Sequence, residues 1–226
     1  MMDRDEWPGG ERRSPASTQP DYWTLNEVSS RLRRSLTELR LAPGGIVLDV
    51  GCGNQPYRPF FEERGLRYLG VDEGLFQVAV VARNEALPFR ADSVDLVVSS
   101  QVLEHVEDPR KCMREAHRIL KPGGVLILSV PFVWEVHNYP RDYWRFSDQA
   151  IRQLLTGFEI LTLDPASTSL QAILQAFNLW LHRSYRQSFW RDWLIRCSNR
   201  VIRGPASRTR DRLLPATYFC VAKKAQ

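Results

Sequence analysis

The residues most suited to chemistry follow an apolar run at positions 46–50. This run contains Asp49 and breaks at once into Gly51 and Gly53. In open α/β sheets ligands bind beyond the carboxyl ends of the strands, and glycine lets the backbone approach a ligand that a Cβ would push away. A dinucleotide fingerprint needs a third glycine at position 56, where this chain has Pro56. The turn therefore favours a nucleoside without phosphates and weakens the interpretation as an NAD-dependent oxidoreductase.

A second carboxylate stands where it could bind a ribose. Residues 67–72 are typical of a short strand, and this strand ends in Asp72. In nucleotide-binding α/β folds an acid about 20 residues beyond the glycine turn accepts hydrogen bonds from ribose hydroxyls. We therefore predict that the glycine turn and Asp72 bind one nucleoside together; the alternative is an acid that only begins a loop.

Five segments occur in an order typical of one enzyme family. They lie within residues 46–131 and are Val47–Gly53, Gly70–Asp72, Ala86–Phe89 with Ser93–Val97, Leu103–Val106 and Arg118–Gly124. In sequence and order they resemble the class I S-adenosylmethionine-dependent methyltransferases, and the chain is similar to the type 11 subgroup. The resemblance implies S-adenosyl-L-methionine as the cofactor and a Rossmann-like α/β fold.

The resemblance also implies a set of cofactor-binding residues. The set comprises Asp49, Gly51, Gly53, Asp72, Asn84, Glu85 and Gln101. Asp49 either meets the amino group of the cofactor or only caps the turn. Arg83 stands where the family has an adenine-reading acid, which leaves Asn84, Glu85 or main-chain contacts for the adenine. Gln101 is expected to face the methionine part, or else to begin a solvent-facing helix.

Three further polar positions fit structural roles as well as functional ones. Asp95 lies early in a buried strand, where we expect a structural hydrogen bond. Glu104 and His105 form a family-like pair, in which His105 either buttresses the sheet or takes part in catalysis. Because the four cysteines lack metal-type spacing, we assign no metal ligand and expect reduced cysteines.

Aromatic and ionisable residues are dense at positions 137–146, after a strand that ends near Pro131. Loops held on a rigid sheet commonly carry function, so this loop is predicted to form the acceptor pocket. It also resembles the His-x-x-Pro-x-Asp-Tyr-Trp-Arg element of one methyltransferase subgroup. The predicted catalytic residues are His137, the leading base candidate, and Tyr143; the predicted substrate residues are Asp142, Trp144 and Arg145. The alternative is a structural lid that seals the cofactor from water.

A strongly basic segment spans residues 182–212. Nine arginines and two aspartates give it a formal charge of +7, whereas the whole chain carries +5. Its arginines alternate with aromatic residues on an expected amphipathic helix, a pattern that suits peripheral contact with an anionic membrane or a lipid-linked substrate. RNA or a nucleotide substrate could use the same charge. The remaining alternative is a helix packed on its own domain with solvated charges.

The expected elements alternate between strand and helix, which predicts a parallel sheet. Helices are predicted at 22–41, 57–65, 109–120 and 148–157, and strands at 46–50, 67–72, 77–82, 94–99, 125–130, 158–163 and 217–222. The fold class is therefore α/β: a seven-stranded, mostly parallel Rossmann-like sheet with helices on both faces and a helical insertion before the last strand.

The chain length and composition suit one soluble domain. The 226 residues are divided into a disordered tail at 1–20 and a methyltransferase domain at 21–226 that includes a basic helical insertion at 166–212. The first residues have no signal-peptide pattern, and the longest apolar stretch is too short to span a bilayer. We expect a cytoplasmic location, with the basic segment as a peripheral membrane contact.

The function that these features favour is methyl transfer to a small-molecule, glycan or lipid-linked acceptor. Two classes of nucleic-acid methylation are disfavoured, because neither an Asn/Asp-Pro-Pro-Tyr motif nor a Pro-Cys nucleophile follows the strand at 94–99. The alternatives are an RNA or protein methyltransferase and a non-catalytic module that binds S-adenosylmethionine.

Overall fold

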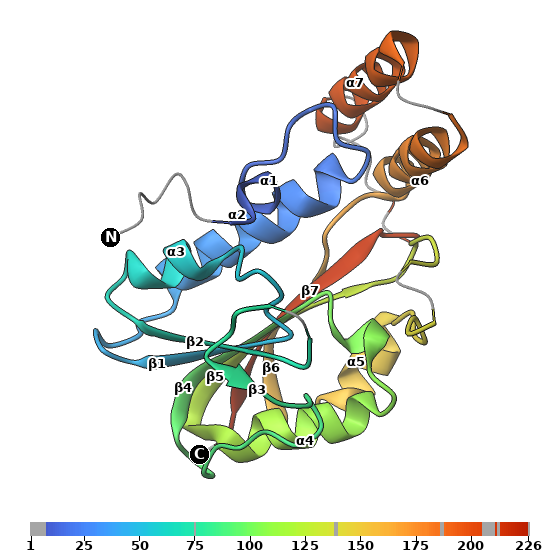
Figure 1. Cartoon of the computed structure of the whole chain (residues 1–226). Helices are drawn as coiled ribbons and strands as arrows, with labels where there is room; N and C mark the ends of the chain where they lie inside the picture. Colours follow the sequence, from blue (N-terminus) through green and yellow to red (C-terminus); the bar gives the residue numbers. More distant parts are fainter. Residues whose placement is uncertain are drawn as a thin grey trace.

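Within the computed structural model, residues 8–74, 76–137, 140–185, 188–204, 211 and 213–225 are described. Across these residues, seven strands form one sheet of order β3-β2-β1-β4-β5-β7-β6 (Figure 1). The strands are β1 Ile46–Val50, β2 Arg67–Asp72, β3 Val80–Val81, β4 Val94–Ser100, β5 Leu120–Pro131, β6 Phe158–Pro165 and β7 Thr217–Lys224. β7 runs antiparallel to both of its neighbours, β5 and β6, and the other neighbouring pairs are parallel. The predicted Rossmann-like sheet and its seven strands are confirmed.

Helices cover both faces of this sheet, as expected (Figure 1). They are α1 Gly10–Arg13, α2 Tyr22–Glu38, α3 Arg58–Glu62, α4 Pro109–Ile119, α5 Asp148–Leu154, α6 Ser169–Ser184 and α7 Phe189–Arg203, with a short 3₁₀ turn at Leu103–His105. Successive residues of a strand point to opposite faces. In β4, Leu96 and Val98 therefore pack with α2 and α3, whereas Val97 packs with α4 and α5. The continuous apolar run of β4 follows from burial on both faces.

The ends of the helices follow the capping residues in the sequence. The Asp108 carboxylate accepts a hydrogen bond from the Lys111 backbone N–H at 3.0 Å, and Pro109 occupies the first turn of α4. Ser147 caps α5 through the backbone N–H of Ala150. These side chains satisfy backbone donors that a helix leaves free at its first turn.

The N-terminal segment differs from its expected disorder. Residues 1–7 lie outside the described residues, but residues 8–20 contain α1 and pack on the domain. A guanidinium nitrogen of Arg13 donates to the Pro56 carbonyl at 2.7 Å, and the Asn199 amide donates to the Ser17 carbonyl at 2.8 Å. Both partners are distant in sequence, so the local composition of residues 8–20 could not indicate that this segment is ordered.

The helical insertion lies between β6 and β7, and α6 and α7 pack side by side within it (Figure 1). Buried amides hold it in place: Gln175 hydrogen bonds with Thr24 of α2, and Asn178 donates to Asn199 across the two helices at 2.9 Å. Over the described part of the chain, no helix is both long enough and apolar enough to cross a bilayer.

Candidate functional site

The glycine turn after β1 has the backbone shape that its sequence predicts. Gly51 and Gly53 have φ values of +71° and +51°, in the left-handed region. The Gly51 N–H donates to the Val71 carbonyl at 2.8 Å and ties the turn to the end of β2. A Cβ at Gly51 would lie 2.5 Å from a methyl carbon of Val102. Both the φ angle and the space therefore require glycine at position 51.

Asp72, at the end of β2, organises this turn. One carboxylate oxygen accepts from the Gly53 N–H at 2.9 Å and the other accepts from the Gly74 N–H at 2.9 Å. Each oxygen of a carboxylate has two lone pairs, so both can still accept a hydrogen bond from a ligand. The carboxylate borders the cavity described next.

A cavity of about 190 Å³ opens at the carboxyl ends of β1, β2 and β4. Its lining comprises Gly51, Asp72, Glu73, Asn84, Gln101, Val102, His105, Val106 and Arg141. Four of the seven predicted cofactor residues lie in this lining. An adjoining cavity shares Glu73, His105, Val106 and Arg141 and adds Glu85 and Tyr143. The fold thus gathers residues from five separate chain segments at one edge of the sheet.

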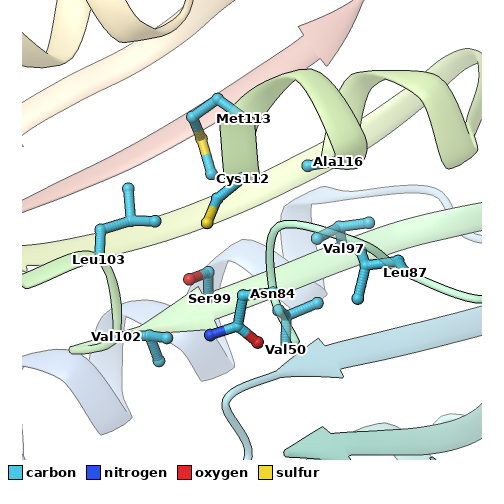
Figure 2. A pocket seen from close by; sticks show the side chains of 10 residues that line it. All are labelled: Val50, Asn84, Leu87, Val97, Ser99, Val102, Leu103, Cys112, Met113 and Ala116. Carbon is cyan, nitrogen blue, oxygen red and sulfur yellow. The ribbon is translucent and has the colours of Figure 1, made fainter. Parts of the chain in front are cut away.

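Asn84 also belongs to an apolar pocket between the sheet and α4. Figure 2 shows Asn84 and Ser99 among side chains of β1, β4 and α4, including Val50, Val97 and Met113. The Asn84 Oδ1 atom is buried and has no hydrogen-bond partner among the described residues. One carboxylate oxygen of Glu85 is also buried and unpartnered there. These two acceptors are available to a ligand with N–H or O–H donors.

Asp49 lies beneath the turn rather than in the cavity lining. It is 3% exposed, and the Tyr68 hydroxyl donates to its Oδ2 at 2.6 Å. Burial raises the pKa of Asp49 to about 7, although the Tyr68 hydrogen bond opposes this effect. The carboxyl therefore exchanges its proton near neutral pH.

Gln101 follows β4 with an unusual backbone conformation. Its φ is +56°, and its N–H donates to the Ser129 carbonyl at 2.9 Å. A non-glycine residue in this region is uncommon and is often found at functional sites. The residue precedes the 3₁₀ turn and lines the cavity, so it does not begin a solvent-facing helix.

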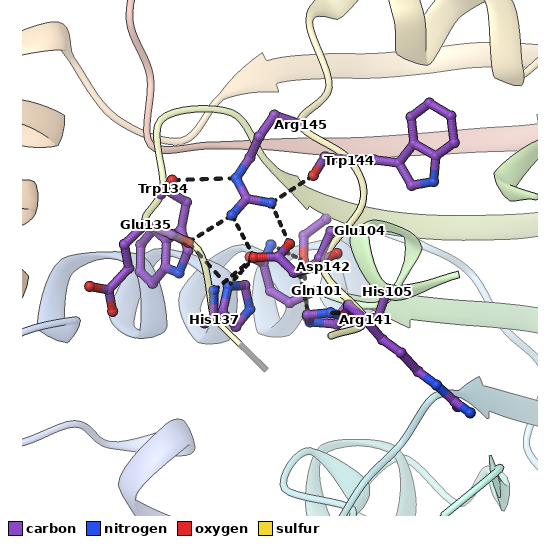
Figure 3. Close-up of polar contacts among 12 residues, drawn as sticks. Gln101, Glu104, His105, Trp134, Glu135, His137, Arg141, Asp142, Trp144 and Arg145 are labelled. Carbon is purple, nitrogen blue, oxygen red and sulfur yellow. Dashed lines mark hydrogen bonds and ion pairs between the residues drawn. The ribbon is translucent and has the colours of Figure 1, made fainter. Parts of the chain in front are cut away.

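The aromatic loop is organised around a buried ion pair (Figure 3). Both terminal nitrogens of Arg145 donate to Asp142, at 2.6 and 2.9 Å, and the His137 backbone N–H donates to Asp142 at 2.7 Å. The Asp142 side chain is 1% exposed, and the hydrogen bonds from Arg145 hold its pKa well below the usual range. Asp142 and Arg145, predicted as substrate residues, are directed at each other. Their contacts indicate that they position the loop.

The remaining residues of this loop face different spaces. Tyr143 is 47% exposed and borders the cavity that contains Glu85, while its N–H donates to the Glu104 carbonyl at 2.7 Å. The Trp144 indole N–H donates to the Val106 carbonyl at 2.9 Å. Its ring lines a separate groove of about 720 Å³ beside α4 and α5. Tyr143 therefore borders the cavities at the edge of the sheet, and Trp144 does not.

A cluster that sequence reasoning did not assemble lies beside His137. The rings of His105 and His137 meet edge to face, with their centroids 4.7 Å apart. Glu104 next to them is fully buried, and burial raises its pKa to about 8. Burial also lowers the pKa of His105, although its hydrogen bond with the Arg141 carbonyl opposes this effect. The only sequence signal was the adjacent pair Glu104-His105.

Comparison with known proteins gives the site a context. Residues 48–128 match the type 11 family model described as "Methyltransferase domain". An "Uncharacterized methyltransferase" of Mycobacterium avium is 41% identical over 106 residues, which are 41% of this chain and 42% of that protein. The chain thus spans about two fifths of the length of the curated relatives it matches.

Two solved structures share the fold over most of this chain. The [4+2]-cyclase SpnF superposes with a TM-score of 0.61 at 19% identity, covering 89% of this chain and 83% of that one. Phosphoethanolamine N-methyltransferase 2 of Haemonchus contortus, in complex with phosphomonomethylethanolamine and S-adenosylhomocysteine, gives 0.57 at 19% identity and covers 96% of this chain and 59% of that one. The aromatic loop and the insertion lie outside the family match.

Proposed function

We propose that this chain, whose residues 48–128 match the type 11 methyltransferase domain of class I S-adenosylmethionine-dependent enzymes, methylates a small-molecule, glycan or lipid-linked acceptor. The observation that carries the proposal is the cavity where Gly51, Asp72, Asn84 and Gln101 meet. S-adenosyl-L-methionine, the cofactor that this family implies, supplies an electrophilic methyl group on a sulfonium when bound.

The cavity offers hydrogen-bond acceptors that suit the adenosine part of this cofactor. The Asp72 carboxylate has acceptor capacity left for ribose hydroxyls, and the buried Oδ1 of Asn84 and an oxygen of Glu85 suit an adenine amino group. Asp49 accepts a hydrogen bond from Tyr68 and does not line the cavity. Gln101 lines the cavity and is assigned to the methionine end of the cofactor.

The acceptor side of the proposed site is the loop of His137 and Tyr143. The imidazole Nδ1 of His137 forms a hydrogen bond with the Glu135 carbonyl at 3.3 Å and lies 3.3 Å from the Asp142 carboxylate, and these contacts orient the ring. An imidazole held in this way can take a proton from an acceptor hydroxyl or ammonium group, provided that it lies within hydrogen-bond reach. Alignment alone supplies much of the acceleration of a methyl displacement. We therefore place His137 and Tyr143 on the acceptor side, with His137 as the base candidate and Tyr143 in contact with the acceptor.

The insertion borders this side and supports a lipid-linked acceptor. Arg183, near the end of α6, pairs at 2.7 Å with Glu135, which lies just before the aromatic loop of residues 137–146. The exposed aromatic strip comprises Trp180, Tyr185, Phe189, Trp190 and Trp193. Arg196 and Arg200 are exposed on α7, whereas Arg191 is buried and paired with Asp192. Arg186, Arg208, Arg210 and Arg212 lie outside the described residues. Aromatic side chains beside arginines suit an anionic membrane surface.

Calorimetry and a transfer assay test the proposed activity. We expect the chain to bind S-adenosylhomocysteine but not NADH. We also expect it to transfer a radiolabelled methyl group into the lipid or small-molecule pool of a fractionated lysate. His137→Ala and Tyr143→Ala should keep cofactor affinity and lower transfer, by about 100-fold or more if His137 is the base. Label in the RNA or protein pool would instead identify the rival acceptor classes.

The fold also hosts other chemistry, as the likeness to a [4+2]-cyclase illustrates. A chain that binds S-adenosylhomocysteine and labels no pool would be a binding module or would catalyse another reaction. That outcome would reject methyl transfer while keeping the cofactor assignment.

Membrane contact is tested separately by co-sedimentation with vesicles. Binding to anionic but not neutral vesicles, weakened by salt, is expected because exposed charges are screened. Arg196→Glu with Arg200→Glu should abolish it, and Trp190→Ala with Trp193→Ala should weaken it. If the wild-type chain stays in solution with anionic vesicles at low salt, the lipid-linked acceptor loses its main support.

A further inference from the structure

Glu104, His105 and His137 bring three metal-binding side chains together. Each offers one ligand atom, and the three atoms lie within 4.8 Å of one another. Glu104 and His105 belong to the 3₁₀ turn after β4, and His137 lies in the loop after β5. Because β4 and β5 are parallel neighbours, their carboxyl ends bring the two segments side by side (Figure 3). A first-row divalent ion holds such ligands at about 2.0–2.2 Å, so less than about 1 Å of movement closes the site.

The buried carboxylate of Glu104 points independently to a ligand. Its side chain is fully buried, and neither oxygen has a hydrogen-bond partner among the described residues. The Nε2 atom of His105 lies 3.8 Å from Oε1, which is beyond hydrogen-bond distance. A buried acid without partners is costly, and an unaccounted ion is one recognised explanation for such a group.

The two imidazoles are oriented as metal ligands usually are. The Nδ1 atom of His105 lies 2.6 Å from the Arg141 carbonyl, and Nδ1 of His137 lies 3.3 Å from the Glu135 carbonyl. A histidine that binds a metal typically donates its other ring N–H to a carbonyl or carboxylate, which fixes the tautomer. Both rings therefore keep Nε2 free to bind an ion.

We propose that Glu104, His105 and His137 bind one divalent transition-metal ion of the Zn²⁺ and Co²⁺ class. Two imidazoles and one carboxylate suit these ions and leave coordination positions open. His105 lines both cavities at the edge of the sheet, so the ion lies between the proposed cofactor cavity and the loop assigned to the acceptor. While the ion is bound, the Nε2 atom of His137 is a metal ligand and does not take a proton from the acceptor.

The test uses the full chain without a histidine tag, stripped of metal with a chelator and titrated with Co²⁺. Visible absorption of the bound ion reports the ligand set, and competition with Zn²⁺ reports affinity. We expect one equivalent to bind. Glu104→Gln and His137→Ala should each weaken binding by at least about 100-fold, more than the loss of an outer partner. His182→Ala is the matched control, since His182 is exposed on α6, and it should bind as the wild type does.

Circular dichroism and the melting temperature of the metal-free variants establish that each still folds. The proposal is overturned if the wild type binds no Co²⁺ at micromolar concentrations, or if the folded Glu104→Gln and His137→Ala variants keep wild-type affinity. Since the assay contains neither cofactor nor acceptor, its failure is distinct from a failure of methyl transfer.

Discussion

Replacing Asp49 with asparagine should stabilise the protein at alkaline pH. The carboxyl is buried under the glycine turn, and its pKa of about 7 lies well above the ordinary value of 3.8. Between these two pH values the unfolded chain has released the proton while the folded chain still holds it. Stability therefore falls as pH rises from about 4 to about 7, and above pH 7 the loss is complete. Asparagine cannot ionise, and its Oδ1 can still accept the Tyr68 hydrogen bond.

The size of the effect follows from the difference in pKa. Each pKa unit corresponds to about 1.4 kcal/mol, so the raised pKa of Asp49 lowers the stability of the wild type by about 4 kcal/mol at pH 8 and by about 2 kcal/mol at pH 5. The free energy of unfolding of Asp49→Asn, relative to the wild type, should therefore rise by roughly 2–3 kcal/mol between these pH values. Other groups titrate equally in both proteins and cancel from this comparison.

Urea unfolding at pH 5, 6, 7 and 8, followed by circular dichroism, measures this difference. Asp95→Asn is a control of opposite sign. Although burial acts to raise it, hydrogen bonds from Lys121 and the Ile46 N–H hold the pKa of Asp95 below its ordinary value. The wild type should therefore be more stable than Asp95→Asn at neutral pH and lose that advantage in acid. Parallel pH profiles for Asp49→Asn and the wild type would refute the reasoning.

Three further substitutions test the site and the insertion. Gly51→Ala should abolish binding of S-adenosylhomocysteine in calorimetry, because its φ is +71° and the added Cβ would lie 2.5 Å from Val102; unchanged affinity would contradict this. Asp72→Ala should weaken that binding by about 1–3 kcal/mol while the far-ultraviolet spectrum stays the same, and full affinity would remove the ribose assignment. Asn178→Ala should lower the free energy of unfolding by about 1–3 kcal/mol, since the buried Asn178 donates to Asn199; a neutral result in urea unfolding would show that the amide pair is dispensable.

The sheet was predictable because its signals are local. β1 and β4 are predicted by their apolar runs, and β2 by a short strand pattern that ends in Asp72. The glycines after β1 are needed for the backbone angles that the structure shows. The cap at Asp108 likewise acts within one turn of helix. The third strand was harder: it was expected near 77–82 but comprises only Val80–Val81, since pairing with β2 rather than propensity sets its length.

The site was only partly predictable because its decisive contacts join distant segments. The sequence indicated that the loop of His137 is functional, but it did not indicate that Asp142 forms an ion pair with Arg145. Nor did it indicate that His137 would meet Glu104 and His105, which are more than thirty positions earlier. That encounter depends on β4 and β5 being adjacent, and no spacing motif records it. The order of residues 8–20 was missed for the same reason.

The insertion leaves and rejoins the sheet at a single point. Pro165 at the end of β6 pairs with Tyr218 near the start of β7, and the Ala166 N–H donates to the Thr217 carbonyl at 2.8 Å. The insertion therefore connects two antiparallel neighbours, β6 and β7, as a long hairpin loop does. Doubling the length of such a loop adds only about 0.6 kcal/mol to the entropic cost of closing it. A segment of another length or composition could replace it without changing strand register or the glycine turn. The fold thus has an interchangeable module at β6–β7, so that specificity can diverge while the nucleoside half stays fixed.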